Sequence, residues 1–118
     1  MSKPFNTTLL DHALLKKRAE NEQRRQETLR RVLHMLPQLA TKYGFNRAYL
    51  FGSITQKGRF RKNSDIDIAV AGLSDEKYFA FIAEFSERLG REIDVVQIEK
   101  HRLEKRIRET AIEWNGND

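Results

Sequence analysis

The segment from Ser64 to Val70 most constrains the fold of this chain, because its acidic and apolar side chains alternate: Ser-Asp-Ile-Asp-Ile-Ala-Val. Alternation with a period of two indicates a β-strand, on which Asp65 and Asp67 point to one face and the two isoleucines point into the core. Asp is disfavoured in strands, so packing does not explain why two of them stand here. The segment predicts a core strand that presents a pair of carboxylates.

A second strand and a tight turn precede this pair. Tyr49-Leu-Phe51 is apolar and runs directly into Gly52-Ser53. Gly52 permits close approach of the backbone, and a helix that opened after it would direct free N–H groups at a phosphate. Adjacent carboxylates repel each other unless a cation lies between them, and hard oxygen ligands favour Mg²⁺ or Mn²⁺. Turn and carboxylates together indicate metal-dependent nucleotide chemistry.

A third acid is expected from a later strand. The run Glu92-Ile-Asp-Val-Val-Gln97 has the apolar content of a short strand and would bring Asp94 beside the first two aspartates. Taken alone, an Asp-x-Asp pair is more often solvated surface than a metal site, because alternation is ordinary in sheets. The combination of Gly-Ser turn, paired aspartates and third aspartate is more specific than any of its parts.

These segments resemble the minimal nucleotidyltransferase family of the DNA polymerase β-like superfamily. The resemblance rests on Phe51-Gly-Ser, on Ser64 to Val70 and on Ile93-Asp-Val-Val96, and it covers about residues 43–112. It implies an α/β (α+β) fold with a small mixed β-sheet flanked by helices, as in the polymerase β-like palm, here with a long N-terminal helix.

The resemblance also implies a role for each site residue. Gly52 and Ser53 would hold the triphosphate of ATP. Asp65, Asp67 and Asp94 would be the catalytic residues and the metal ligands, with Mg²⁺ (or Mn²⁺) as cofactor, and Asp94 would help to activate the acceptor hydroxyl.

Lys57 is the expected third nucleotide-binding residue. Many relatives carry a short Ala-Arg-Gly-like segment after the Gly-Ser, whereas this chain reads Ile54-Thr-Gln-Lys-Gly58, one residue longer. Lys57 keeps the positive charge but lacks the bidentate fork of Arg. The glycine and the lysine stand in the wrong order for a P-loop, and we exclude that motif.

Helical patterns surround the expected strands. A long helix should open at the capping pattern of Thr8 and end near Gly44, with Pro37 kinking or restarting it. Its residues 16–28 have almost nothing to bury. The apolar residues before this polar gap are therefore expected to stand away from the core.

Two later helices are expected, at 74–90 and at about 100–114. The first begins at a Ser-Asp-Glu capping sequence, and the second carries Leu103, Ile107, Ala111 and Ile112 on one side. We divide the single domain into residues 1–42, a helical segment and candidate partner-binding arm, and residues 43–118, the nucleotidyltransferase core.

Composition limits the partners. The net charge is +5 and the pI is near 9.7, yet Glu20, Glu22 and Glu27 interleave with the basic residues of the first helix. That pattern is typical of a solvated helix, so we do not favour nucleic-acid binding by this segment. Cysteine is absent, which excludes disulfides and thiolate metal sites. No stretch has the length and hydropathy to span a bilayer, and we expect a cytoplasmic protein.

The resemblance finally implies a partner. Relatives of this size commonly act as antitoxins of a small helical toxin of the HEPN class. The resemblance therefore implies that AMP is transferred from ATP to a hydroxyl of that toxin, typically of a tyrosine, within a hetero-oligomer. The segment Thr8–Leu15 is expected to contact it. Two alternatives stay open: an antitoxin that neutralises its partner by binding alone, and nucleotidyl transfer to a small molecule or an RNA end.

Overall fold

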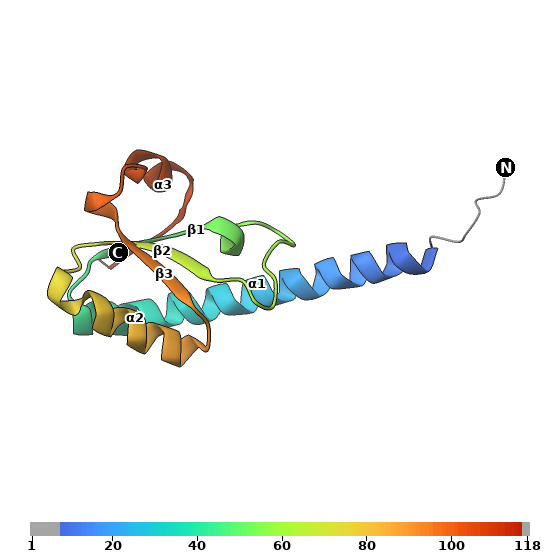
Figure 1. Cartoon of the computed structure of the whole chain (residues 1–118), viewed down its shortest axis with the longest axis horizontal. Helices are drawn as coiled ribbons and strands as arrows, with labels where there is room; N and C mark the ends of the chain where they lie inside the picture. Colours follow the sequence, from blue (N-terminus) through green and yellow to red (C-terminus); the bar gives the residue numbers. More distant parts are fainter. Residues whose placement is uncertain (1–7, 117–118) are drawn as a thin grey trace.

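The computed structural model describes residues 8–116. Its elements, in chain order, are α1 (Thr8–Tyr43), β1 (Arg47–Phe51), the 3₁₀ turn η1 (Gly52–Thr55), β2 (Ile66–Ala71), α2 (Asp75–Leu89), β3 (Ile93–Gln97), the 3₁₀ turn η2 (Ile98–Lys100), α3 (Glu104–Thr110) and β4 (Ile112–Asn115) (Figure 1). Across residues 8–116, no helix is long and apolar enough to cross a membrane.

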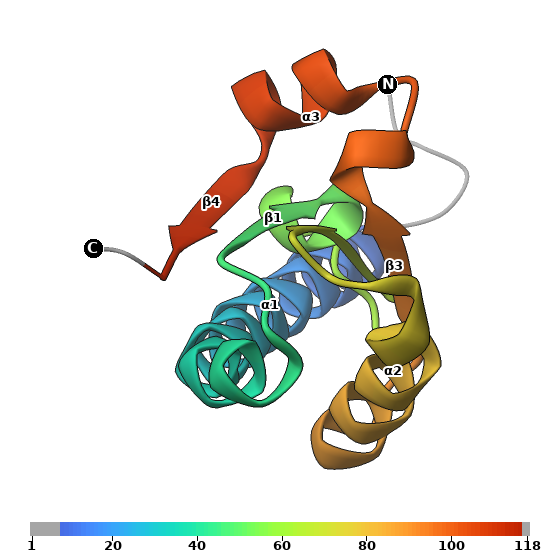
Figure 2. The same cartoon turned by 90° about the vertical axis from the view of Figure 1, so that its left-hand side faces the viewer.

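The strands form one mixed sheet in the order β3-β2-β1-β4. β1 runs antiparallel to β2 and to β4, whereas β2 and β3 are parallel and are joined by the crossover helix α2. Figure 2 shows α1 and α2 on one side of the sheet and the short α3 on the other. This confirms the predicted α/β fold with a small mixed sheet and helices mainly on one side.

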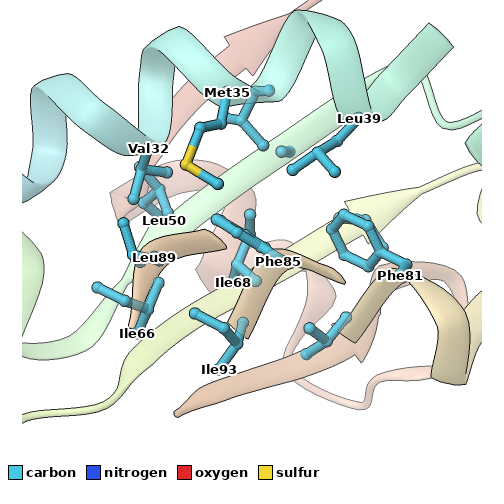
Figure 3. Close-up of a cluster of buried hydrophobic side chains, with 14 of the residues drawn as sticks. Val32, Met35, Leu39, Leu50, Ile66, Ile68, Phe81, Phe85, Leu89 and Ile93 are labelled. Carbon is cyan, nitrogen blue, oxygen red and sulfur yellow. The ribbon is translucent and has the colours of Figure 1, made fainter. Parts of the chain in front are cut away.

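The main core lies between the sheet and the two long helices. Side chains from both helices meet the isoleucines of β2 there, and Ile66 and Ile68 are completely buried, as the alternation predicts. The residues labelled in Figure 3 are Val32, Met35, Leu39, Leu50, Ile66, Ile68, Phe81, Phe85, Leu89 and Ile93. With the isoleucines on this face, the aspartates of β2 must face the α3 side.

α1 is one continuous helix of 36 residues, so the expected restart at Pro37 is wrong. Leu36 and Leu39 on either side of the proline are fully buried, and their packing keeps the helix intact through the missing hydrogen bond. The helix ends at Tyr43 as predicted, where the Gly44 N–H donates to the Ala40 carbonyl at 2.8 Å.

The first part of α1 projects from the molecule. Residues 8–20 are all exposed, and Leu9 and Leu15 keep 79% and 63% of their surface in contact with solvent. This projection gives the protein its extents of 64 × 29 × 25 Å (Figure 1). From Thr28 onward the same helix contributes to the core, so α1 belongs to both segments into which the sequence divides the chain.

The predicted helix over 100–114 is wrong. α3 spans only Glu104–Thr110, and the chain then enters β4, whose Ile112 pairs with Leu50 at the free edge of β1. Strand pairing satisfies backbone groups that β1 would otherwise leave open, and Ile112 and Trp114 suit a strand. Trp114 packs edge to face on Phe45, with ring centroids 6.0 Å apart.

Candidate active site

Parallel pairing of β2 and β3 brings two of the predicted aspartates together. Asp67 and Asp94 are direct register partners, so their side chains leave the sheet on the same face. Asp65 lies two residues before Asp67, immediately ahead of β2, and shares that face. Asp65 and Asp94 are exposed, and Asp67 is half-buried between them.

The electrostatics of Asp67 show that these carboxylates share one site. Its pKa is raised above the ordinary value, first because burial disfavours the charged form, then because of the charges of Asp94 and Asp65. A cation placed between the three carboxylates would reverse this penalty.

Gly52 brings the Gly-Ser turn against the same carboxylates. Its φ is +74°, and a Cβ built on it would overlap the carboxylate of Asp67. The register explains this approach, because Phe51 at the end of β1 pairs with Asp67. Glycine is thus required at position 52 both for the backbone conformation and for the space that the carboxylate occupies.

No full helix opens after Gly52. The chain makes only the single 3₁₀ turn η1, in which the Thr55 hydroxyl donates to the Gly52 carbonyl at 2.7 Å and the Gln56 N–H donates to the Ser53 carbonyl at 3.1 Å. The expected helix N-terminus is therefore replaced by a short turn, because residues 56–65 must leave it as a loop to reach β2. Ser53 and Lys57 line one cleft of about 1060 Å³ beside this turn.

Helix α1 holds the loop that follows η1. The Gly58 N–H donates to Glu22 Oε1 at 2.9 Å, and Asn21 Nδ2 donates to the Gly58 carbonyl at 3.4 Å. Arg25 donates to both carboxylate oxygens of Glu22 at 2.9 and 2.7 Å, and also to the Ile54 carbonyl at 3.2 Å. We call Asn21, Glu22 and Arg25 the α1 clamp.

Glu22 of the α1 clamp is more acidic than an ordinary glutamate. Hydrogen bonds from Arg25 and then from Gln26 lower the pKa of Glu22 to about 2. The sequence does not reveal the clamp, because its Glu-x-x-Arg spacing is the same as that of a solvated ion pair on a helix surface. Nothing in the local sequence shows that Gly58, 36 residues later in the chain, packs against Glu22.

The donor set fits a hard divalent cation. Asp65, Asp67 and Asp94 supply the oxygen ligands that Mg²⁺ or Mn²⁺ prefers. Within residues 8–116, no three acidic or histidine side chains already stand in the arrangement of a metal site. The three carboxylates lie in mutual repulsion rather than at ligand distance, so their metal-binding role stays a prediction.

A family model decides the classification. The model of polymerase beta nucleotidyltransferases matches residues 36–113, which hold β1 to β3, η1 and all three aspartates. The chain belongs to the polymerase beta nucleotidyltransferase family. The match confirms the resemblance seen in the sequence. No curated protein matches the chain.

Solved structures share the fold of this nucleotidyltransferase. A protein described as a minimal nucleotidyltransferase has 27% sequence identity, with 73% of this chain and 92% of that chain covered at a TM-score of 0.63. A toxin–antitoxin structure with AMP-PNP has 27% identity and a TM-score of 0.51, with 58% of this chain covered. The chain spans 59% of the length of that protein.

An MntA–HepT toxin–antitoxin structure has the same fold at lower identity. It is 20% identical, with 70% of this chain and 69% of that chain covered at a TM-score of 0.53. This nucleotidyltransferase presents Asp65, Asp67 and its Gly-Ser turn at one end of the two central strands, β1 and β2, in contact with solvent.

Proposed function

We propose that this chain is a Mg²⁺-dependent nucleotidyltransferase that moves AMP from ATP to a hydroxyl, of a tyrosine by preference, on a HEPN-type toxin and so acts as its antitoxin. One observation carries the proposal: Gly52 lies against Asp67, and Asp67 is the register partner of Asp94. A phosphate-sized turn and three carboxylates therefore share one open site. The family match supports nucleotidyl transfer as the class of reaction.

Each residue has a defined part in the reaction. Ser53 and Lys57 bind the phosphates beside Gly52, and Asp65 and Asp67 face the α-phosphate. The acceptor oxygen attacks the α-phosphorus, the bond to the bridging oxygen of the β-phosphate breaks, and pyrophosphate leaves. Asp94 takes the proton of the attacking hydroxyl. Bound metal ions would stabilise the charge on the attacking and leaving oxygens.

A smaller cleft fits the nucleoside part of ATP. It has a volume of about 370 Å³ and shares the lining residue Gln56 with the cleft at Ser53. Gly52 and Thr55 form one wall, and Leu103, Arg106 and Ile107 come from the α3 region. The volume lies in the range of small-molecule sites, and the mixed apolar and polar lining suits a base with its ribose.

Similarity to toxin–antitoxin structures supports the choice of acceptor. Two such structures share the fold, and one of them was solved with AMP-PNP. The projecting end of α1 supports a protein partner as well. Its exposed residues Leu9, Leu10 and Leu15 have no packing role within the part of the chain that the structure describes.

The same exposed leucines favour a second candidate, an antitoxin that neutralises its partner by binding alone. In that case Asp65→Asn would still neutralise the toxin, because the contact would not need the carboxylates. Transfer to a small molecule or an RNA end would leave any protein partner unmodified.

One experiment separates these functions. The chain is co-expressed with the protein encoded by the neighbouring gene, and the purified complex is incubated with Mg²⁺ and ATP labelled on the α-phosphate. Asp65→Asn is the test variant. Glu92→Gln is the matched control, because this exposed carboxylate lies near the site but outside the predicted ligand set.

The proposed function predicts label on the partner with the wild-type chain and with Glu92→Gln. Asp65→Asn should lose about 10²-fold or more, the scale lost when one charge-stabilising group is removed. Full labelling by Asp65→Asn would overturn the mechanism. A stable complex without label would favour the binding antitoxin, and neither complex nor label would direct the search to small-molecule and RNA acceptors.

A further inference from the structure

Two basic segments that lie far apart in the sequence face each other across one cleft. Lys17 and Arg18 of α1 form one wall, and Lys57, Arg59 and Arg61 of the loop before β2 form the other. In Figure 1 this loop reaches down to α1 beside the base of its projecting part. The α1 clamp holds the two walls together through Gly58.

The basic lining continues beyond this cleft. A second cleft of about 640 Å³ shares Lys17, Asn21, Arg61 and Ser64 with the first and adds Arg24 and Lys62. Glu20 is its only acidic lining residue in the described chain. We call the two together the basic cleft. One end of it is at Ser53, and the other end is at Asn63.

The cations of the basic cleft are uncompensated. No ion pair recorded between residues 8 and 116 involves a side chain that lines it. The local potential is positive: the pKa of Arg91 is lowered first by burial and then by the charges of Arg24 and Arg31. Like charges held close together favour a polyanion that neutralises several of them at once.

We propose that the basic cleft binds the phosphate backbone of a nucleic-acid strand. The site extends well beyond what one nucleotide needs, because the first cleft alone, at about 1060 Å³, reaches the upper size of small-molecule sites and the second prolongs it. ATP bound at Ser53 would occupy only part of it. The remaining cations, among them Lys17, Arg61 and Lys62, line space that further phosphates of a longer chain can occupy.

The lining favours a nucleic acid over an acidic protein. Leu14 is the only apolar side chain among the residues that line the basic cleft, whereas protein interfaces have an apolar and aromatic centre. Arginine forks and the donors of Asn21, Gln56 and Asn63 suit phosphate oxygens. The exposed Leu9, Leu10 and Leu15 of α1 lie outside this lining.

The lining also defines the mode of binding. Among residues 8–116, no aromatic side chain lines either part of the basic cleft, so these residues offer bases no stacking platform there. Binding should therefore be independent of sequence and depend steeply on salt. For single strands, log K falls against log salt with a slope of about 0.7 for each phosphate contact. Five to six such contacts would give a slope of roughly 4.

The test uses the full chain and a fluorescein-labelled single-stranded RNA of 20 nucleotides with mixed sequence, followed by fluorescence anisotropy over a series of salt concentrations. Single-stranded DNA and duplex RNA of the same length distinguish the source of the phosphates. Poly-glutamate of matched charge tests the acidic-protein alternative as a competitor.

Charge-reversed variants locate the site. Lys17→Glu with Arg61→Glu changes one cation on each wall, both exposed. Lys77→Glu with Arg102→Glu makes the same change in net charge at exposed positions outside the basic cleft. We expect the first pair to weaken RNA binding about tenfold or more and to reduce the salt slope by about 1.4, and the second pair to change affinity less than about threefold.

Asp65→Asn separates this inference from the proposed function, because it lies outside the basic cleft and should bind RNA as the wild type does. Equal losses in both charge-reversed pairs would mean unspecific attraction and would overturn the proposal. So would an absence of salt dependence, or displacement of RNA by poly-glutamate as effective as displacement by unlabelled RNA.

Discussion

Asp67 and Asp94 are register partners on the parallel strands β2 and β3, and the pKa of Asp67 is raised first by burial and then by the charge of Asp94. The two carboxylates concentrate negative charge at a half-buried position, although core packing does not require charged side chains there. The protein thus keeps at this point a group that destabilises its unliganded form, which is typical of a functional site.

The first prediction concerns stability and pH. Because the folded-state pKa of Asp67 is raised above 3.8, the folded state holds this proton more tightly than the unfolded state. The contribution of Asp67 to the free energy of unfolding therefore falls as pH rises from about 3.8 through the raised pKa. Asp67→Asn should be more stable than the wild type near neutral pH in metal-free buffer, as measured by urea unfolding.

Two further measurements check this prediction. The advantage of Asp67→Asn should vanish in acid, where the wild-type carboxyl is protonated too, and Mg²⁺ should raise the melting temperature of the wild type more than that of the variant. Asp11→Asn, on the exposed part of α1, is the control for removing a carboxylate. A variant that is less stable than the wild type at neutral pH would contradict the assignment.

The second prediction separates backbone strain from space at Gly52. Gly52 and Gly58 have nearly equal φ values, +74° and +75°, but a Cβ meets the Asp67 carboxylate at the first and nothing within 4 Å at the second. Alanine at either position should cost roughly 1–2 kcal/mol of strain. Gly52→Ala should lose further stability and abolish AMP transfer, whereas Gly58→Ala should keep transfer. Equal effects of both variants in unfolding and transfer assays would refute the close approach.

The third prediction concerns the α1 clamp. Glu22→Gln removes the charge that binds Arg25 and weakens the acceptor of the Gly58 N–H, so the loop after η1 should become mobile. We expect faster hydrogen exchange over residues 56–60 and a higher KM for ATP, with a smaller change in kcat, because the clamp positions the phosphate-binding turn without touching the reacting atoms.

Glu27→Gln is the matched control for the clamp, because Glu27 is exposed on the same helix and contacts nothing in the loop. The low pKa of Glu22, about 2, adds a pH signature. Its stabilising contribution is complete above about 4.5 and is lost as pH falls toward 2, and Glu22→Gln should abolish this part of the acid response. Unchanged exchange in the loop would argue against the clamp.

The fourth prediction concerns the partner-binding arm. Leu9→Glu, Leu10→Glu and Leu15→Glu together remove three exposed leucines of α1 and leave Leu14, which lines the basic cleft, and the α1 clamp unchanged. The triple variant should keep its melting temperature and lose the toxin in co-purification. Lys16→Glu with Gln23→Glu makes the same change in net charge at exposed polar positions, leaves that surface in place and serves as control. Wild-type toxin binding by the leucine variant would show that the arm is not the contact.

The sequence predicts the directions of the side chains around Asp67, because these depend only on local alternation. The period of two placed Asp65, Asp67 and the buried isoleucines correctly, since side chains on a strand have only two directions. The helix predicted over 100–114 is correct at Ile107 and wrong at Ile112. Ile112 fits the helical spacing equally well, but it pairs instead with the open edge of β1, which lies some sixty residues earlier in the chain. Edge pairing is information that no local window contains.

The basic cleft was missed for a related reason. The sequence places Lys17 and Arg18 in a solvated helix, and it places Lys57 to Lys62 in a basic cluster between the two halves of the predicted site, where they could attract the polyphosphate of ATP or an acidic acceptor surface. The two groups meet because Glu22 accepts a hydrogen bond from the Gly58 N–H. Only the tertiary structure shows that they form opposite walls of one cleft.

Because α1 is continuous, it fixes the position of its projecting end relative to the rest of the protein. The exposed residues 8–20 extend about 20 Å beyond the clamp at about 1.5 Å per residue, and they are rigidly in phase with it. Four inserted residues would advance the leucines by about 6 Å and turn them by about 40° around the helix axis. A partner bound to these leucines would therefore hold its acceptor group at a distance and an angle from the aspartates that the number of helical turns in between determines.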